Sequence, residues 1–166
     1  WWPVYIWAMR KRVDKAFQAR VIHYNMHLSN LESKLKDGRL GADRRAEIAE
    51  EMAEEVGLEY GKAMAETLEP TSTHRSFQGA LHAIADALSA HGFAARAEHA
   101  DEDDELQIVA EHCPFGDAVV EHPVICAVDR GIVKGMLAHM IGSTPGADTA
   151  SSLAQGDDVC VTHVSL

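Results

Sequence analysis

Residues 111–140, EHCPFGDAVVEHPVICAVDRGIVKGMLAHM, decide the fold of this 166-residue chain. The segment CPFG is a loop, because proline and glycine interrupt regular structure. The residues that follow, HPVICAVDRGIVKGMLAHMIG, have an apolar side chain at every third or fourth position, which predicts a helix. The apolar face of this helix comprises Ile125, Val128, Ile132, Met136 and Met140.

Residues on both sides of this helix have a different period and predict strands. Residues 93–100 and 106–112 form the arms of a hairpin around the acidic turn DEDDE, since apolar and polar residues alternate in the second arm. The end of the chain, VCVTHVSL at 159–166, predicts a further strand, and the segment 142–152 between helix and strand predicts a loop or a weak edge strand. In the order of the chain, the helix therefore lies between the strands of a small antiparallel sheet.

Two more helices precede the hairpin. Apolar residues four apart from Asp43 to Leu68 predict one helix, and this spacing drifts around the helix, so it should cross its partner at an angle. Gly57 and Gly61 lie inside it and cost stability unless a neighbour packs closely there. The next helix begins near Phe77 and ends before Gly92. Helices followed by an antiparallel sheet with one embedded helix constitute an α+β fold.

The N-terminal quarter divides into two segments. Residues 1–12, WWPVYIWAMRKR, are aromatic and then basic, which is typical of an interfacial anchor at the cytoplasmic face of a membrane. Packing against the domain or a second subunit explains the same aromatics equally well. Residues 13–42 have a heptad-like apolar seam, which favours a coiled-coil homodimer or an ordinary amphipathic helix. Residues 43–166 then form the α+β domain.

Composition excludes some functions. The formal net charge of −11 argues against a nucleic-acid partner, because such affinity depends on clustered Lys and Arg. Three cysteines in a chain of this length are not typical of a secreted disulfide scaffold, so the sequence favours a reducing, cytoplasmic setting. The aromatic opening is too short to cross a bilayer alone.

Cys113, Cys126 and Cys160 are the candidate functional residues. Their spacing satisfies no metal motif, and burial as small apolar residues would explain them as well. Cys126 lies near the start of its helix, where the backbone dipole should lower the pKa of its thiol and favour metal binding or redox reactivity. The acidic pair in GDD, residues 156–158, is placed before a strand and predicts a tight turn.

The motifs CPF, HP-x-x-C-A-x-D-R-G and G-D-x-x-C resemble the methanogen output domain and the related C-terminal regulatory half of winged-helix regulators, which include the Suf-operon repressors. The resemblance covers about residues 48–166. It implies a dimeric sensing or output module whose relatives respond to an iron-sulfur cluster or a small ligand. We expect the winged-helix DNA-binding domain of those regulators to be replaced here by the aromatic segment and the heptad helix.

The resemblance also implies the site residues. Cys113, Cys126 and Cys160 match three of the four cluster ligands, whereas His139 lies near the place of the remaining one. We therefore expect a site of three cysteines and His139 for an iron-sulfur cluster or a transition metal.

Three functions remain as hypotheses. The first is a non-enzymatic regulatory domain at the cytoplasmic face of a membrane, which dimerises through its heptad helix and binds a metal or small ligand. The second is a small-molecule hydrolase or ligand-binding protein resembling the aminothiazoline carboxylate hydrolases, with Cys113 or Asp129 at its pocket. The third is an accessory subunit of a membrane complex, in which residues 1–12 contact a membrane protein.

Overall fold

A computed structural model describes residues 40–68, 76–100, 105–142 and 146–165. The aromatic segment 1–12 and nearly all of the heptad helix at 13–42 lie outside the described residues. The chain divides into two compact units, Trp1–Ile48 and Ala49–Leu166. The first unit is described only from residue 40.

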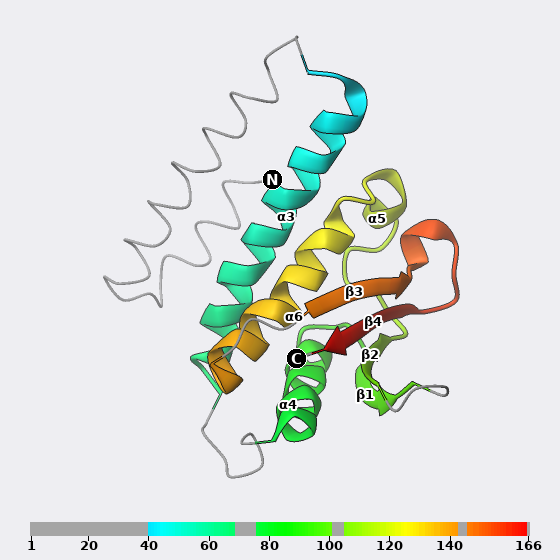
Figure 1. The fold of residues 1–166 in the computed structure, drawn as a ribbon. Coiled ribbons are helices and arrows are strands. Elements are labelled where there is room, and N and C mark those ends of the chain that lie inside the picture. Colours follow the sequence, from blue (N-terminus) through cyan, green and yellow to red (C-terminus); the bar gives the residue numbers. More distant parts are fainter. Residues whose placement is uncertain (1–39, 69–75, 101–104, 143–145, 166) are drawn as a thin grey trace. The chain divides into compact units, whose positions relative to one another are not determined.

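The sheet has four antiparallel strands, β1 (Ala95–His99), β2 (Leu106–Ala110), β3 (Gly146–Ser151) and β4 (Cys160–Ser165). Their order is β1-β2-β4-β3, so β3 and β1 are the edges (Figure 1). The predicted hairpin is confirmed, as is the C-terminal strand. Within the segment 142–152, residues 146–151 form the edge strand β3, one of the two expected outcomes.

The helices are α3 (Ala42–Ala65), α4 (Phe77–Ala90), the short α5 (Ala118–Glu121) and α6 (Ile125–Ile141). The hydroxyl of Ser76 accepts a hydrogen bond from Gly79 N, which satisfies one of the free amides at the start of α4. Gly142 ends α6 with a left-handed backbone at φ 74°. The helices followed by a four-stranded antiparallel sheet confirm the α+β class.

One face of the sheet contacts α4 and α6 and forms the core (Figure 1). Side chains from both helices and from the middle strands are almost inaccessible to solvent there. The largest of them are Leu81 and Ile84 of α4 and Met136 and Leu137 of α6, which pack with Ile108 of β2 and Val164 of β4. In β2 the alternating side chains of Leu106, Ile108 and Ala110 pack in this core, and β4 contributes Val164.

Glycines let α3 and α6 cross with their backbones in contact. A Cβ atom at Gly57 or Gly61 would lie within 3.0 Å of the backbone of Val128 or Ile132 on α6. The reverse holds for Gly131 and Gly135 of α6, whose Cβ atoms would collide with the backbone of α3. Two glycine pairs, each four residues apart, thus face one another. This backbone contact is the close neighbour that Gly57 and Gly61 were expected to have.

A charged fork reinforces the crossing. The two carboxylate oxygens of Glu54 on α3 accept hydrogen bonds from Arg130 Nε at 2.7 Å and from Lys134 Nζ at 2.6 Å, both on α6. Burial opposes ionisation of Glu54, but the two cations outweigh it and hold the pKa of the carboxyl below its ordinary value. All three side chains are largely shielded, so this pairing contributes more than a surface salt bridge.

Replacing Glu54 with glutamine should lower the free energy of unfolding by about 2 kcal/mol at pH 7. The folded pKa of Glu54 is lowered, so its contribution is present above the unfolded pKa and is lost as the pH falls through the folded pKa. Urea unfolding of E54Q and wild type at pH 7 and pH 3 measures both effects. The exposed Glu50 serves as a matched control, since E50Q should change little. An equal effect of E54Q at both pH values would contradict the role of the carboxylate charge.

Candidate functional site

Three cysteines and a carboxyl meet where the loop after β2, the first turns of α6 and the start of β4 come together. We call the set Cys113, Cys126, Asp129, Ser152 and Cys160 the thiol–carboxylate site. Asp129 and the other two thiols each influence the pKa of Cys113, which shows that these groups lie close together. The structure therefore brings together the three cysteines that the sequence selected.

Hydrogen bonds hold each thiol in place. Cys126 Sγ lies 3.3 Å from the hydroxyl of Ser152, at the end of β3. Leu153 N donates to Cys160 Sγ at 3.3 Å. Cys113 Sγ accepts a hydrogen bond from the backbone of Phe115, within the CPFG loop. Cys113 is buried, whereas Cys126 and Cys160 are partly exposed.

A tight turn sets the position of two of these thiols. The 3₁₀-helix η2 (Leu153–Gln155) follows β3, and Asp157 Oδ2 accepts a hydrogen bond from Ser152 N at 2.8 Å. Gly156 has a left-handed backbone at φ 94°. The GDD motif thus forms a turn, as predicted, and the turn presents Ser152 and Leu153 to the sulfurs.

The expected lowering of the Cys126 pKa is wrong. Burial raises the pKa of the Cys126 thiol, and the hydrogen bond from Ser152 opposes this only in part. Burial likewise raises the pKa of Cys113. The loss of hydration on burial outweighs the helix dipole at Cys126, because it disfavours the thiolate more than the free amides of the first helical turn favour it.

Asp129 is the most perturbed group of the site. It lies one turn after Cys126 on α6, its Oδ1 atom is shielded from solvent, and among the described residues no hydrogen-bond partner contacts that atom. Burial alone raises the pKa of Asp129 to about 7. An unpartnered buried carboxyl is costly and is found more often at functional sites than elsewhere.

His139 does not join the cysteines. It lies in the last turn of α6, whereas Cys126 lies in the first, and a helix rises 1.5 Å per residue, so about 20 Å separates them along the axis. Within the described residues, which include all four expected ligands, no group of three His, Cys, Asp or Glu side chains could hold a metal ion. The donor set does not fit an iron-sulfur cluster.

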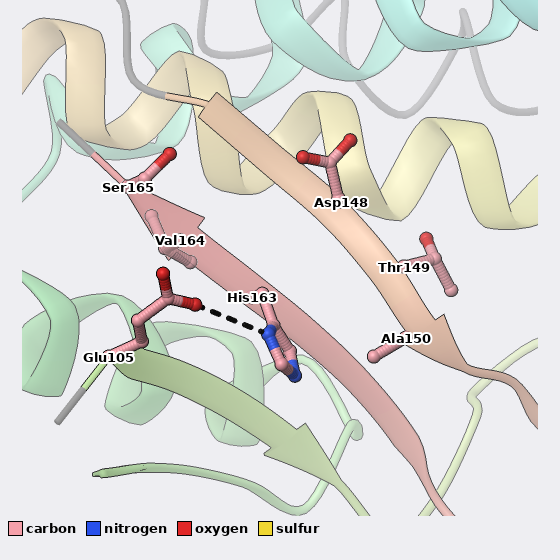
Figure 2. Close-up of a pocket in the computed structure, with 7 residues that line it drawn as sticks. All are labelled: Glu105, Asp148, Thr149, Ala150, His163, Val164 and Ser165. Atoms are coloured by element: carbon pink, nitrogen blue, oxygen red, sulfur yellow. Dashed lines mark ion pairs between the residues drawn. The ribbon is translucent and has the colours of Figure 1, made fainter. Parts of the chain in front are cut away.

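A separate groove of about 250 Å³ runs along β3 and β4 and contains none of the cysteines (Figure 2). His163 Nδ1 lies 3.6 Å from Glu105 Oε2 in this groove, and both side chains are well exposed. Such an exposed pair contributes little, and the groove holds no buried polar group. We therefore place the candidate site at the thiols and Asp129.

The sequence identified the thiols of this site but gave Asp129 a role only in the hydrolase hypothesis, and it did not single out Ser152. One signal could have found Asp129. Cys126 and Asp129 are three residues apart on one helix, a spacing that places both on the same face. Ser152 depends on contacts between segments far apart in the sequence, which no local pattern reports.

Comparisons with known proteins agree with this fold. Trafficking protein particle complex subunit 3 from Naegleria fowleri, in a crystal structure covalently bound to palmitic acid, superposes with a TM-score of 0.59 at 14% sequence identity. The match covers 91% of this chain and 95% of that one, and at this identity it shows a shared fold. No curated protein matches. Among the described residues, no helix is long and apolar enough to cross a membrane.

The family comparison covers more than the segment in which the motifs lie. The model of methanogen output domain 1 matches residues 28–165, which include all three cysteines, Asp129 and the two crossing helices. This chain therefore belongs to the methanogen output domain 1 family.

Proposed function

We propose that the chain is a non-enzymatic regulatory output domain whose responsive group is Asp129. The observation that carries this proposal is the shielded Oδ1 atom without a partner. A small ligand that donates a hydrogen bond or carries a positive charge would remove the free-energy cost of burying that atom without a partner. Binding of a proton would do the same. The donor set does not favour a metal, so the ligand of this proposal is a small molecule or ion that pairs with a carboxylate.

Three consecutive residues of α6 connect the site to α3. Asp129 faces the thiols, Arg130 binds Glu54 of α3, and Gly131 contacts the backbone of α3. Packed helices have few alternative arrangements, so a shift of this turn of α6 moves the crossing with it. A change in the state of Asp129 would therefore reach α3, and through it the segment that precedes residue 42.

Hydrogen exchange tests this coupling. The amides of α3 from residue 53 to 63 should exchange several-fold faster at pH 8 than at pH 6, after correction for intrinsic rates, because Asp129 ionises between them. The variant D129N should show no such change. The amides of α4 are the internal control, since a merely global loss of stability would change both helices alike. Equal behaviour of α3 and α4 would contradict the proposal.

Dimerisation is the remaining element of the proposal. The heptad pattern of residues 13–42 supports a homodimer formed through that helix, which would carry the signal out of the domain. Light scattering on the full chain should give twice the monomer mass of 18.1 kDa. A variant with lysine in place of Leu28 and Leu31, both on the apolar seam, should be monomeric, and a wild-type monomer would contradict this element.

A second candidate function is an accessory subunit of a membrane complex. The shared fold with a subunit of a trafficking complex supports it, together with the aromatic and basic residues 1–12. Removing residues 1–12 should then release the chain from the membrane fraction or from its partner. Unchanged fractionation would count against this candidate.

A further inference from the structure

Two partly exposed thiols flank one turn of the chain. Cys126 Sγ contacts Ser152 Oγ and Cys160 Sγ contacts Leu153 N, each at 3.3 Å, and these two turn residues are adjacent in sequence. Cys126 begins α6 and Cys160 begins β4, so both thiols are fixed to regular elements. The turn belongs to the connection from β3 to β4, in which Ser152 N donates to Asp157 Oδ2 and Ala154 N donates to Ser152 Oγ.

Cys113 differs from this pair in its access to solvent. It is 7% exposed, whereas the other two cysteines are in the intermediate range. Its sulfur also accepts a backbone hydrogen bond from Phe115 within its own loop. A small oxidant in water therefore meets Cys126 and Cys160 before it meets Cys113.

We infer that Cys126 and Cys160 form a reversible disulfide when the protein meets a peroxide, which makes the thiol–carboxylate site responsive to oxidants. This inference rests on the site of the proposed function and names a second input to it. The amide of Leu153 supplies the hydrogen bond that a negatively charged sulfur requires, so Cys160 is the attacking thiol and Cys126 the resolving one.

The reaction balances with hydrogen peroxide as the oxidant. The sulfur of Cys160 attacks one peroxide oxygen, the O–O bond breaks, and a sulfenic acid and one water form. The thiol of Cys126 then attacks the sulfenic sulfur, the S–S bond forms, the S–O bond breaks, and a second water leaves. The two thiols lose two electrons and two protons, and the peroxide gains them.

The disulfide would change the structure around Asp129. A sulfur–sulfur bond holds the two Cβ atoms about 4 Å apart and removes both thiol protons, so the contacts of Ser152 and Leu153 with the sulfurs would change. The start of α6 is then tied to the start of β4. Oxidation would therefore act on the same helix that carries Asp129 and the crossing to α3.

Mass spectrometry of the full chain after treatment with hydrogen peroxide tests the inference. The product should be lighter by two hydrogen atoms, should lose two of its three titratable thiols, and should give a peptide that joins Cys126 to Cys160. A reductant such as dithiothreitol should restore all three thiols. The amides of residues 153–155 should exchange at least several-fold faster in the oxidised protein.

Single cysteine variants provide the controls. C113S should form the disulfide as wild type does, whereas C126S and C160S should not. A peptide that joins Cys113 to either partner, a disulfide between two chains, or sulfenic and sulfinic products without a crosslink would each overturn the inference. The pH dependence of α3 exchange in unoxidised protein is a separate measurement, so the redox inference and the proposed function fail independently.

Discussion

Replacing Asp129 with asparagine should raise the free energy of unfolding at pH 8 by about 2 kcal/mol. The shift of the Asp129 pKa from its ordinary 3.8 to about 7 corresponds to at most about 4 kcal/mol at 1.36 kcal/mol per unit. Part of this will not be recovered, because asparagine also leaves its buried side-chain oxygen without a partner.

The sign of the pH dependence of stability follows from proton binding. Between pH 4 and 7 the folded protein holds a proton on Asp129 that the unfolded chain has lost, so stability falls as the pH rises through this window. D129N should therefore gain on wild type progressively between pH 4 and pH 7, from about 2 kcal/mol less stable near pH 4 to about 2 kcal/mol more stable above pH 7, where the difference is constant.

Urea unfolding of wild type and D129N at pH 4, 5, 6, 7 and 8 measures this difference and cancels the titration of other groups. Asp86, on the exposed face of α4, supplies the control, since D86N should differ from wild type by less than about 0.5 kcal/mol. A D129N protein that is less stable than wild type at pH 8 would show that the carboxylate has a partner.

Replacing Gly131 with alanine should destabilise the protein by about 3 kcal/mol or more. In an isolated helix the same change stabilises by about 1 kcal/mol, so the crossing reverses the usual sign. The added methyl group would collide with the backbone of Glu54 and Leu58 on α3, and backbone cannot move aside as a flexible side chain can. The same reasoning applies to Gly57, Gly61 and Gly135.

Thermal unfolding of G131A and G57A measures this effect, and failure to accumulate as folded protein would be its extreme form. Gly41 is the control, because a Cβ atom there meets nothing within 4 Å. G41A should therefore unfold within a few degrees of wild type. A stable G131A would mean that α3 and α6 are not held in backbone contact.

Local sequence patterns predicted most of the fold. The hairpin, the last strand and the helices from Asp43 and from Phe77 depend on residues near one another in the chain, and their periods report them directly. The need for a close neighbour at Gly57 and Gly61 was also visible, because glycine in a helix interior is costly. The partner, the glycine pair of α6, was not identified, since helix crossings depend on tertiary packing.

The candidate site was predicted less completely. The structure brings together the three cysteines that the sequence singled out, but His139 was included from a family resemblance, and a single helix places it far from Cys126. The direction of the Cys126 pKa was wrong because position on a helix is readable from sequence, whereas burial is not. The raised pKa of Asp129 results from burial of its carboxyl, which only the folded structure shows.

The titration of Asp129 tests most directly whether this residue is the responsive group of the domain. Carbon-13 NMR of the side-chain carboxyl carbons, with D129N to assign the resonance, follows each aspartate separately from pH 3 to pH 9. We expect a midpoint of about 7 for Asp129, well above that of an ordinary carboxyl. A midpoint near 3.8 would show that Asp129 is solvated or paired, and would contradict its role as the responsive group of this domain.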